Sequence, residues 1–277
     1  MTNILTVAHR ELRDDFRNHW ALAITGVFST LALAIAYFGA ATAGHVGFTS
    51  FAATIASLVT LAAFVTPLIA LLVAYDAIVG ERERGTLPLL LSYPLSRRTL
   101  IAGKFLGHSA LLALATLLGL GLALGVIVAT VPEIRTFATL RAIVTFMISA
   151  ALLGASFVAL ACLISALVKE KAQAAGLALL AWLAFVILFD LVLLAVLVLS
   201  GGNATEQALY PWLLLLNPID VFRLINLSGL GANGGDAFLM AMSGTHAYSP
   251  AVLYGALLAW TVLPLGAAAA VFAKAEI

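Results

Sequence analysis

Six long apolar runs separate the charged segments of this chain, and they constrain its fold more than any other feature. A helix needs about 20 mostly apolar residues to cross the hydrocarbon core of a bilayer. The runs cover residues 21–40, 51–79, 105–130, 142–168, 173–200 and 250–273. They are continuously apolar, whereas the strands of a membrane barrel alternate apolar and polar residues. The pattern predicts an all-α integral membrane protein with six transmembrane helices in one domain, residues 1–277.

The composition excludes a water-soluble fold. Hydrophobic residues make up 63% of the chain and charged residues 10%, against about 45–50% and about 25% in soluble domains. With a net charge of +1 and no basic face, the chain is not expected to bind nucleic acid. The single cysteine, Cys162, lies in an apolar run, so we expect a buried thiol rather than a disulfide or a cysteine metal site.

The basic residues are divided unequally between the two sides of the predicted membrane domain. Those on one side are Arg10, Arg13, Arg17, Arg82, Arg84, Arg97, Arg98, Lys104, Lys169, Lys171 and Lys274. Those on the other side are Arg135, Arg141 and Arg223. Because cytoplasmic loops carry the excess of lysine and arginine, both termini are predicted to be cytoplasmic. The external segments are then 41–50, 131–141 and the long loop 201–249.

Residues 1–20 have the pattern of an amphipathic helix. Ile4, Ala8, Leu12, Phe16 and Trp20 recur every four residues, which places them along one side of a helix. Such a helix is expected to lie in the headgroup layer of the membrane. A flexible charged tail is the alternative.

The segment 81–104 has the densest pattern of charged and helix-breaking residues. Its arginines and glutamates before the third run are Glu81, Arg82, Glu83, Arg84, Arg97 and Arg98. We expect the first four at or outside the membrane surface. Gly85 interrupts the helix, and Thr86 is expected to cap a short helix that contains Leu87 and Leu90. Pro94 ends that helix, since the residue before a proline avoids the α region.

A short apolar helix edged with charge is suited to docking into a groove on a soluble partner. An ordinary charged interfacial loop has the same appearance, so on physical grounds both interpretations stand. Ser96 is expected to cap the helix that leads into the third run.

The run ERERGTLPLLLSYPLSRRTLIAGKFLG, residues 81–107, resembles the signature of ABC-2 type permeases. The six runs, the amphipathic N-terminus and the long last external loop are similar to that family along the whole chain. The resemblance implies a permease fold of the type V exporter kind and a homodimer. It also implies two cytoplasmic ABC ATPase subunits, which hold ATP and magnesium and contact the segment 81–98.

A second segment narrows the resemblance. Asn217, Pro218, Asp220 and Arg223 belong to the run NPIDVFRL, residues 217–224, which is similar to the permeases of nitrous oxide reductase maturation systems. The start HRELRDDFRNHWAL, residues 9–22, is similar as well. The resemblance implies a periplasmic copper-handling (NosD-like) partner on the outer face, with these four residues as candidate contacts.

The chain has no motif for catalysis or nucleotide binding. The phosphate-loop pattern G-x-x-x-x-G-K-[ST] does not occur, and the five histidines are scattered. We therefore expect a non-catalytic membrane subunit without a cofactor, with ATP hydrolysed by a separate ABC ATPase.

Three titratable residues in or beside the apolar runs are candidates for a role. Asp190 lies within the fifth run and is either a pathway or gate residue or the cap of a bend near the outer surface. Asp76 is expected to pair with Arg82 or Arg84. His108 is expected to be a partnered histidine at the membrane interface rather than a proton relay.

The external loop 201–249 is too apolar at 210–216 for full exposure. It is expected to form one or two short helices that dip into the outer leaflet, with a break at Asn217-Pro218. Met240, Met242 and His246 carry groups that suit Cu(I). Packing of an apolar loop explains them equally, so no metal site is assigned.

Together these features predict the permease subunit of an ABC transporter in the bacterial inner membrane. It is expected to couple cytoplasmic ATP hydrolysis to copper-site assembly of periplasmic nitrous oxide reductase. A generic ABC-2 exporter of a drug, a lipid or an ion is one alternative. A non-transporting membrane anchor for a periplasmic assembly factor is another.

Overall fold

The computed structural model describes residues 2–17, 19–38, 51–93, 95–130, 136–200, 204–227 and 248–274, and every regular element within these ranges is a helix. The elements are α1 Thr2–Arg17, α2 Trp20–Phe38, α3 Phe51–Ala74, α4 Val79–Glu83, α5 Leu87–Ser92, α6 Arg97–Thr130, α7 Phe137–Leu167, α8 Lys171–Leu183, the π-helix η3 Ala184–Leu188, α9 Phe189–Ser200, α10 Ala204–Leu214, α11 Pro218–Leu227 and α13 Pro250–Lys274.

Five helical segments of the described chain are long and apolar enough to cross a membrane. They are Thr54–Glu83, Arg97–Val126, Phe137–Leu167, Lys171–Leu199 and Pro250–Lys274. These segments coincide with the second to sixth predicted runs. The first predicted run falls in α2, where the apolar segment Leu22–Ala34 is shorter. The sixth span and the side on which the termini lie therefore remain predictions.

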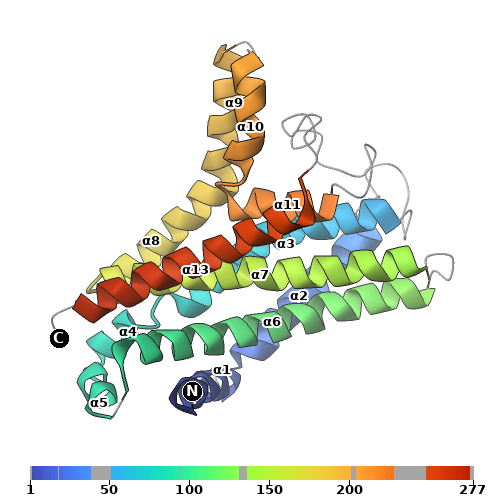
Figure 1. Ribbon diagram of the computed structural model, residues 1–277. Helices are drawn as coiled ribbons and strands as arrows, with labels where there is room; N and C mark the ends of the chain where they lie inside the picture. The colour runs from blue at the N-terminus through green and yellow to red at the C-terminus, as the bar shows by residue number, and fades with distance from the viewer. Residues whose placement is uncertain are drawn as a thin grey trace.

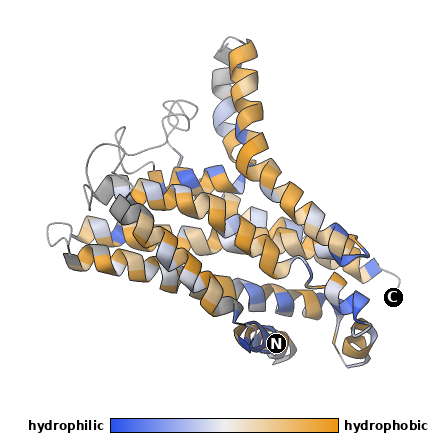
Figure 2. Ribbon diagram, turned by 180° about the vertical axis from the view of Figure 1, so that it is seen from behind, coloured by the Kyte–Doolittle hydropathy of each residue, from blue (hydrophilic) through white to orange (hydrophobic). Residues whose placement is uncertain are grey.

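The long helices form a bundle around α7, which contacts α3, α6, α11 and α13. Phe146, Leu153 and Phe157 on α7 are fully buried, because residues spaced by about seven and four positions share one face of a helix. Figure 1 shows α6, α7 and α13 running side by side. Hydrophilic residues gather at the end of the bundle that carries α1, α4 and α5, which we call the charged end (Figure 2).

The N-terminal helix packs against α6 at two glycines. A Cβ atom on Gly103 would lie 2.5 Å from Val7 Cβ, and one on Gly107 would lie 2.7 Å from Glu11 Cβ. Both distances are too short for any residue but glycine, so the Gly103-x-x-x-Gly107 spacing allows α1 to contact the α6 backbone closely. His19, with φ of 60°, makes the turn from α1 into α2.

The fifth predicted run is a helix with an internal irregularity. It begins as α8 beside α3, passes through the π-helix η3 and continues as α9. Figure 1 shows α9 and α10 projecting from the bundle as a hairpin, which packs through Leu193, Tyr210 and Leu214. The short helices predicted for residues 201–249 are confirmed as α10 and α11, with Asn217 at the break between them.

Candidate functional site

The turn between α4 and α5 at the charged end is built around Gly85. Its φ of +68° lies in the left-handed region, which glycine adopts without steric cost. The helix predicted to follow is confirmed as α5, with Pro88 in its first turn. Thr86 occupies the N-cap position, but its side chain does not cap α5. Its hydroxyl donates instead to the backbone carbonyl oxygen of Glu81, at 3.2 Å, and to the Glu81 carboxylate.

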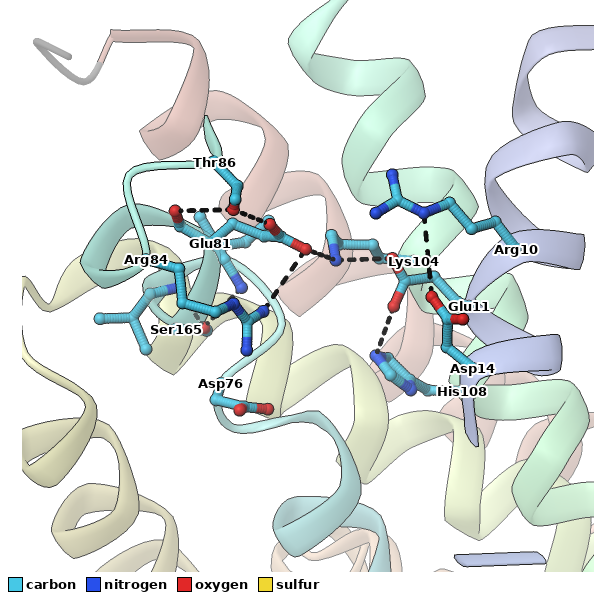
Figure 3. A network of polar contacts seen from close by, with 12 residues as sticks. Arg10, Glu11, Asp14, Asp76, Glu81, Arg84, Thr86, Lys104, His108 and Ser165 are labelled. Carbon is cyan, nitrogen blue, oxygen red and sulfur yellow. Dashed lines mark hydrogen bonds and ion pairs between the residues drawn. The ribbon is translucent and has the colours of Figure 1, made fainter. Parts of the chain in front are cut away.

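Glu81 is buried within the protein, with 7% of its surface exposed; its place at or outside the membrane surface stays a prediction. Its Oε1 atom lies 3.2 Å from Lys104 Nζ and 3.5 Å from a guanidinium nitrogen of Arg84. Lys104 Nζ also donates to Glu11 Oε1 on α1, at 2.7 Å. These contacts, shown in Figure 3, satisfy a carboxylate that would be costly to bury alone.

The next two residues of the charged run contact the ends of other helices. Arg82 donates to the carbonyl oxygen of Val168, the C-cap of α7, at 2.7 Å. Glu83 accepts a hydrogen bond of 2.5 Å from the backbone N–H of Lys171 at the start of α8. Each side chain satisfies a backbone group that its helix leaves unpaired. The charged run therefore joins α4 to α6, α7 and α8 and is not simply a solvated loop.

Ser165 on α7 supplies the cap that α4 lacks. Its Oγ atom accepts hydrogen bonds from the backbone N–H groups of Ile78, at 2.9 Å, and Val79, at 3.0 Å. No local side chain caps α4. The position of α4 is therefore set by α7. Ser165 lies 86 residues after Val79 in the chain.

Arg97 holds the C-terminal helix to the start of α6. Its guanidinium group donates to the carbonyl oxygens of Phe272, at 2.9 Å, and Ala273, at 3.3 Å. It also lies 5.7 Å from the centre of the Phe272 ring, a cation–π geometry. Arg98 is exposed, and Ser96 caps α6 as predicted, accepting from the Thr99 N–H at 3.1 Å.

The leucines of α5 are exposed to different extents. Leu87 is fully buried and Leu90 is half-buried, whereas Leu89 is 66% exposed, as is Tyr93, just after α5, at 65%. Leu87 therefore fixes α5 to the protein, and Leu89 and Tyr93 form the surface available to a partner. Pro94 lies outside the described residues.

Asp76 and His108 are both paired. The prediction that Asp76 pairs with Arg82 or Arg84 is wrong, because its Oδ2 atom lies 2.7 Å from Lys171 Nζ at the start of α8. His108 has partners, as predicted: its Nδ1 atom lies 3.0 Å from Asp15 Oδ2 on α1. A cavity of about 480 Å³ at the charged end is lined by side chains of both signs, including these residues. It gives the buried ion pairs a route to water.

A second charged cluster lies away from the charged end, where α11 meets η3 and α9. Arg223 on α11 pairs with Asp190 of α9, at 2.9 Å, and with Asp220 one turn earlier, at 3.4 Å. Pro218 and Asp220 are buried and Arg223 is 6% exposed. These residues and Asn217 were predicted to contact a periplasmic partner. The structure does not place them at a surface, because their polar groups are used inside the protein.

Asn217 connects this cluster to the π-helix. Its Oδ1 atom accepts from the Ile219 N–H at 3.0 Å, which caps α11, and its Nδ2 atom donates to the carbonyl oxygen of Phe185 at 2.9 Å. Phe185 lies in η3, where the helical hydrogen-bond pattern is irregular. One side chain thus holds α11 against the irregular part of the fifth run.

Comparison with known proteins decides the family. The family model of the ABC-2 family transporter protein matches residues 5–277. The chain belongs to the ABC-2 family.

Two relatives extend the similarity of this ABC-2 permease over its full length. It is 52% identical over 277 residues to the "Probable ABC transporter permease protein NosY" of Pseudomonas aeruginosa, covering 100% of both chains. It is 50% identical over 274 residues to the protein of that name in Stutzerimonas stutzeri, covering 99% of both. The resemblance to ABC-2 permeases is confirmed, and the chain is similar to NosY in particular.

The copper ligands considered for the ABC-2 permease are not tested by its structure. Met240, Met242 and His246 lie outside the described residues. Within the ranges that the structure does describe, no three His, Cys, Asp or Glu side chains are grouped so that they could hold a metal ion. Cys162 is buried, as expected from its apolar neighbours.

Several residues that organise the charged end of the permease were not found from the sequence. Lys104, Glu11 and Ser165 lie on helices far apart in the chain, and no local pattern connects them. One signal was present, because Gly103 and Gly107 mark the place where a helix approaches α6. The spacing was visible in the sequence, but a glycine-rich chain produces it often by chance.

Proposed function

We propose that this ABC-2 permease couples ATP hydrolysis in a separate cytoplasmic ABC ATPase to copper-site assembly of periplasmic nitrous oxide reductase. The observation that supports coupling to an ATPase is the exposed apolar pair formed by Leu89 on α5 and Tyr93 directly after it. Full-length similarity to proteins named NosY supports the second half. In this proposal two permease chains form a homodimer, and each binds one ATPase subunit that holds ATP and magnesium.

The contacts at the charged end supply a mechanical route. A push on α5 acts on the turn at Gly85, and from there on α6 through Glu81 and Lys104. It acts on α8 through the 2.5 Å contact of Glu83 with the Lys171 N–H. Since α8, η3 and α9 are continuous in the chain, a displacement of α8 reaches the cluster at Asp190. On this route Asp190 is a gate residue, not a ligand of a cargo.

The docking half is tested by co-purification with matched variants. Leu89→Glu places a charge on the exposed face of α5, and Leu5→Glu does the same on α1. The two leucines have nearly equal exposure, 66% and 65%, and both lie at the charged end. We expect Leu89→Glu to lose the co-purified ATPase and Leu5→Glu to retain it. Equal retention by both variants would remove α5 from the docking surface.

The copper half is tested in a denitrifying host that lacks the chromosomal copy of the permease. We expect its nitrous oxide reductase to contain less copper, and the wild-type permease to restore it. An ATPase partner that binds but cannot hydrolyse ATP should fail to restore it. Full copper content without the permease would favour a generic exporter. Restoration with the inactive ATPase would favour a non-transporting anchor.

We also propose six spans with cytoplasmic termini in the bacterial inner membrane, supported by the unequal distribution of basic residues. Cys162 is the only cysteine of the chain and is buried, so Cys162→Ala provides a background for labelling. A cysteine introduced at Lys274 should react with an impermeant thiol reagent in inside-out vesicles and not in intact spheroplasts. Labelling in spheroplasts would reverse the orientation.

A further inference from the structure

The cluster at α11 contains more negative than positive charge. Two carboxylates, Asp190 and Asp220, share one guanidinium group, that of Arg223. Asp220 is fully buried, and the Asp190 and Arg223 side chains are 24% and 7% exposed. If both carboxyl groups were ionised, the cluster would carry one unbalanced negative charge away from water. An unbalanced buried charge costs several kcal/mol.

Each carboxyl group also has a second oxygen atom. Asp190 Oδ1 and Asp220 Oδ2 are buried and accept no hydrogen bond from any residue that the structure describes. Both carboxyl groups accept from the same nitrogen, Arg223 Nη1, at 2.9 Å and 3.4 Å, so the two side chains are neighbours. Two neighbouring carboxylates repel each other, whereas a protonated carboxyl group and a carboxylate form a strong hydrogen bond.

Among the residues that the structure describes, the surroundings of the pair provide no other cation. The charged groups that act on Asp220 are Asp190 and Arg223. The uncharged side chain of Asn217 lies at the start of the same helix and donates to Phe185. The described residues of α3 and α7 that contact this part of α11 are uncharged: Phe64 faces Arg223 at 5.9 Å, Phe146 faces Phe222, and Ser149 accepts from Asn226. On α13, Trp260 donates to the Leu215 carbonyl oxygen just before α11.

Burial favours the neutral form of a carboxyl group, and so does a neighbouring carboxylate. Both effects act on Asp220, which lies on α11, outside the candidate spans. Burial first, and then the negative charge of Asp190, raise the pKa of the Asp220 carboxyl group above its usual range. The positive charge of Arg223 opposes them only in part.

We propose that Asp190 and Asp220 form a proton-binding site, in which one proton taken from water is shared between their two carboxyl groups. The proton lies between Asp190 Oδ1 and Asp220 Oδ2, and Arg223 balances the remaining negative charge. The inference is independent of the proposed function. When the proton leaves, the two carboxylates repel and the contact between α9 and α11 weakens, so the site makes this contact sensitive to pH.

Infrared spectroscopy of the full-length protein in detergent tests the site directly. The protein is labelled at the aspartate carboxyl carbon with a heavy isotope, and the C=O stretching band of a protonated carboxyl group is sought at about pH 6.5. Ordinary aspartates, with pKa near 3.9, are ionised there. We expect an isotope-sensitive band in the wild-type protein and none in Asp190→Asn or Asp220→Asn, because removing either partner leaves the other paired with Arg223.

Asp14→Asn is the matched control, because Asp14 is half exposed and pairs with Arg10; it should keep the band. Absence of the band from the labelled wild-type protein would overturn the proposal. This measurement does not depend on whether any variant folds. A band that persists in Asp190→Asn would also overturn it, since the proton would then belong to Asp220 alone.

Thermal unfolding gives a second measurement. The pKa of Asp220 is raised in the folded state, so its carboxyl group binds a proton more tightly there than in the unfolded state. Its contribution to stability is therefore complete below the unfolded pKa of about 4 and is lost as the pH rises through the raised folded pKa. From about pH 5 to about pH 9, we expect the Tm of the wild type to fall relative to that of Asp220→Asn. Parallel Tm profiles would contradict the shared proton.

Discussion

Lys104 Nζ on α6 lies 2.7 Å from Glu11 Oε1 on α1, and 93 residues separate the two in the chain. The same ammonium group lies 3.2 Å from Glu81 Oε1 on α4, the helix that precedes the turn at Gly85. One buried cation on α6 therefore joins α1 to α4. Movement of α4 cannot leave α1 unaffected while both contacts remain.

Replacing Lys104 by methionine should destabilise the protein strongly. The side chain is 3% exposed, and removing it leaves Glu11 and Glu81 without their shared cation. Breaking a buried ion pair costs about 3–5 kcal/mol, which corresponds to a Tm decrease of roughly 6–15 °C for a chain of this size. Scanning fluorimetry in detergent measures the decrease. Lys169→Met is the control, since Lys169 is exposed; equal Tm values for the two variants would contradict the pairing.

Gly103→Ala should be more damaging than Gly125→Ala. A methyl group on Gly103 would meet Val7 at 2.5 Å, whereas one on Gly125 meets nothing within 4 Å. Overpacking costs about 1–3 kcal/mol, while alanine in place of an unconstrained helical glycine stabilises by about 1 kcal/mol. Tm should therefore fall for Gly103→Ala and stay equal or rise for Gly125→Ala. The same sign of change in both variants would show that α1 does not pack on α6 at this glycine.

Asn217→Ala should cost more stability than Ser96→Ala. Both side chains cap a helix, a role worth about 0.5–2 kcal/mol. Asn217 in addition donates to the Phe185 carbonyl oxygen, and losing a buried partner adds about 1–3 kcal/mol. Hydrogen exchange gives a local measurement, in which faster exchange should appear in η3 and α11 of Asn217→Ala. If exchange becomes faster only in the first turn of α11, Asn217 acts only as the cap of that helix.

Substitutions of Gly85 should test whether ATPase binding depends on the backbone conformation of the α4–α5 turn. No atom would contact a Cβ at this position, yet its φ of +68° penalises side chains. Alanine in a left-handed conformation costs about 1–2 kcal/mol, asparagine costs less, and Gly85→Pro cannot adopt this φ at all. We expect co-purified ATPase to decrease from asparagine to alanine to proline. If Gly85→Pro binds the ATPase and stimulates its activity as well as the wild type does, the shape of this turn is not needed for coupling.

The local features of the fold were predictable from the sequence because each depends on neighbouring residues. The second to sixth apolar runs, the amphipathic N-terminal helix, the break at Gly85 and the cap at Ser96 are of this kind. The break before α11 at Asn217 is another. Each of these features depends on residues only a few positions apart. Those residues can be read directly from the sequence.

The partners of the charged residues were not predictable in this way. Asp76 was expected to pair with Arg82 or Arg84, a few residues away, but pairs with Lys171, 95 residues away. The contact between Glu81 and Lys104, at 3.2 Å, was not predicted. The four residues Asn217, Pro218, Asp220 and Arg223 were expected at a contact surface, and the structure uses their polar groups internally. These predictions placed each side chain beside a neighbour in sequence or at the protein surface, because the sequence does not show which distant residues it contacts.

The apolar runs alone establish that the chain is a helical membrane protein, and Gly85 alone predicts that a new short helix begins after it. Hydrophobicity and backbone propensity act locally, so they are independent of how the helices later pack. Which buried charges meet is known from the folded protein alone: Lys104 contacts Glu11 and Glu81, and Arg223 contacts Asp190 and Asp220. Burial makes an unpaired charge costly, and which partner is within reach depends on helix packing that no local pattern encodes.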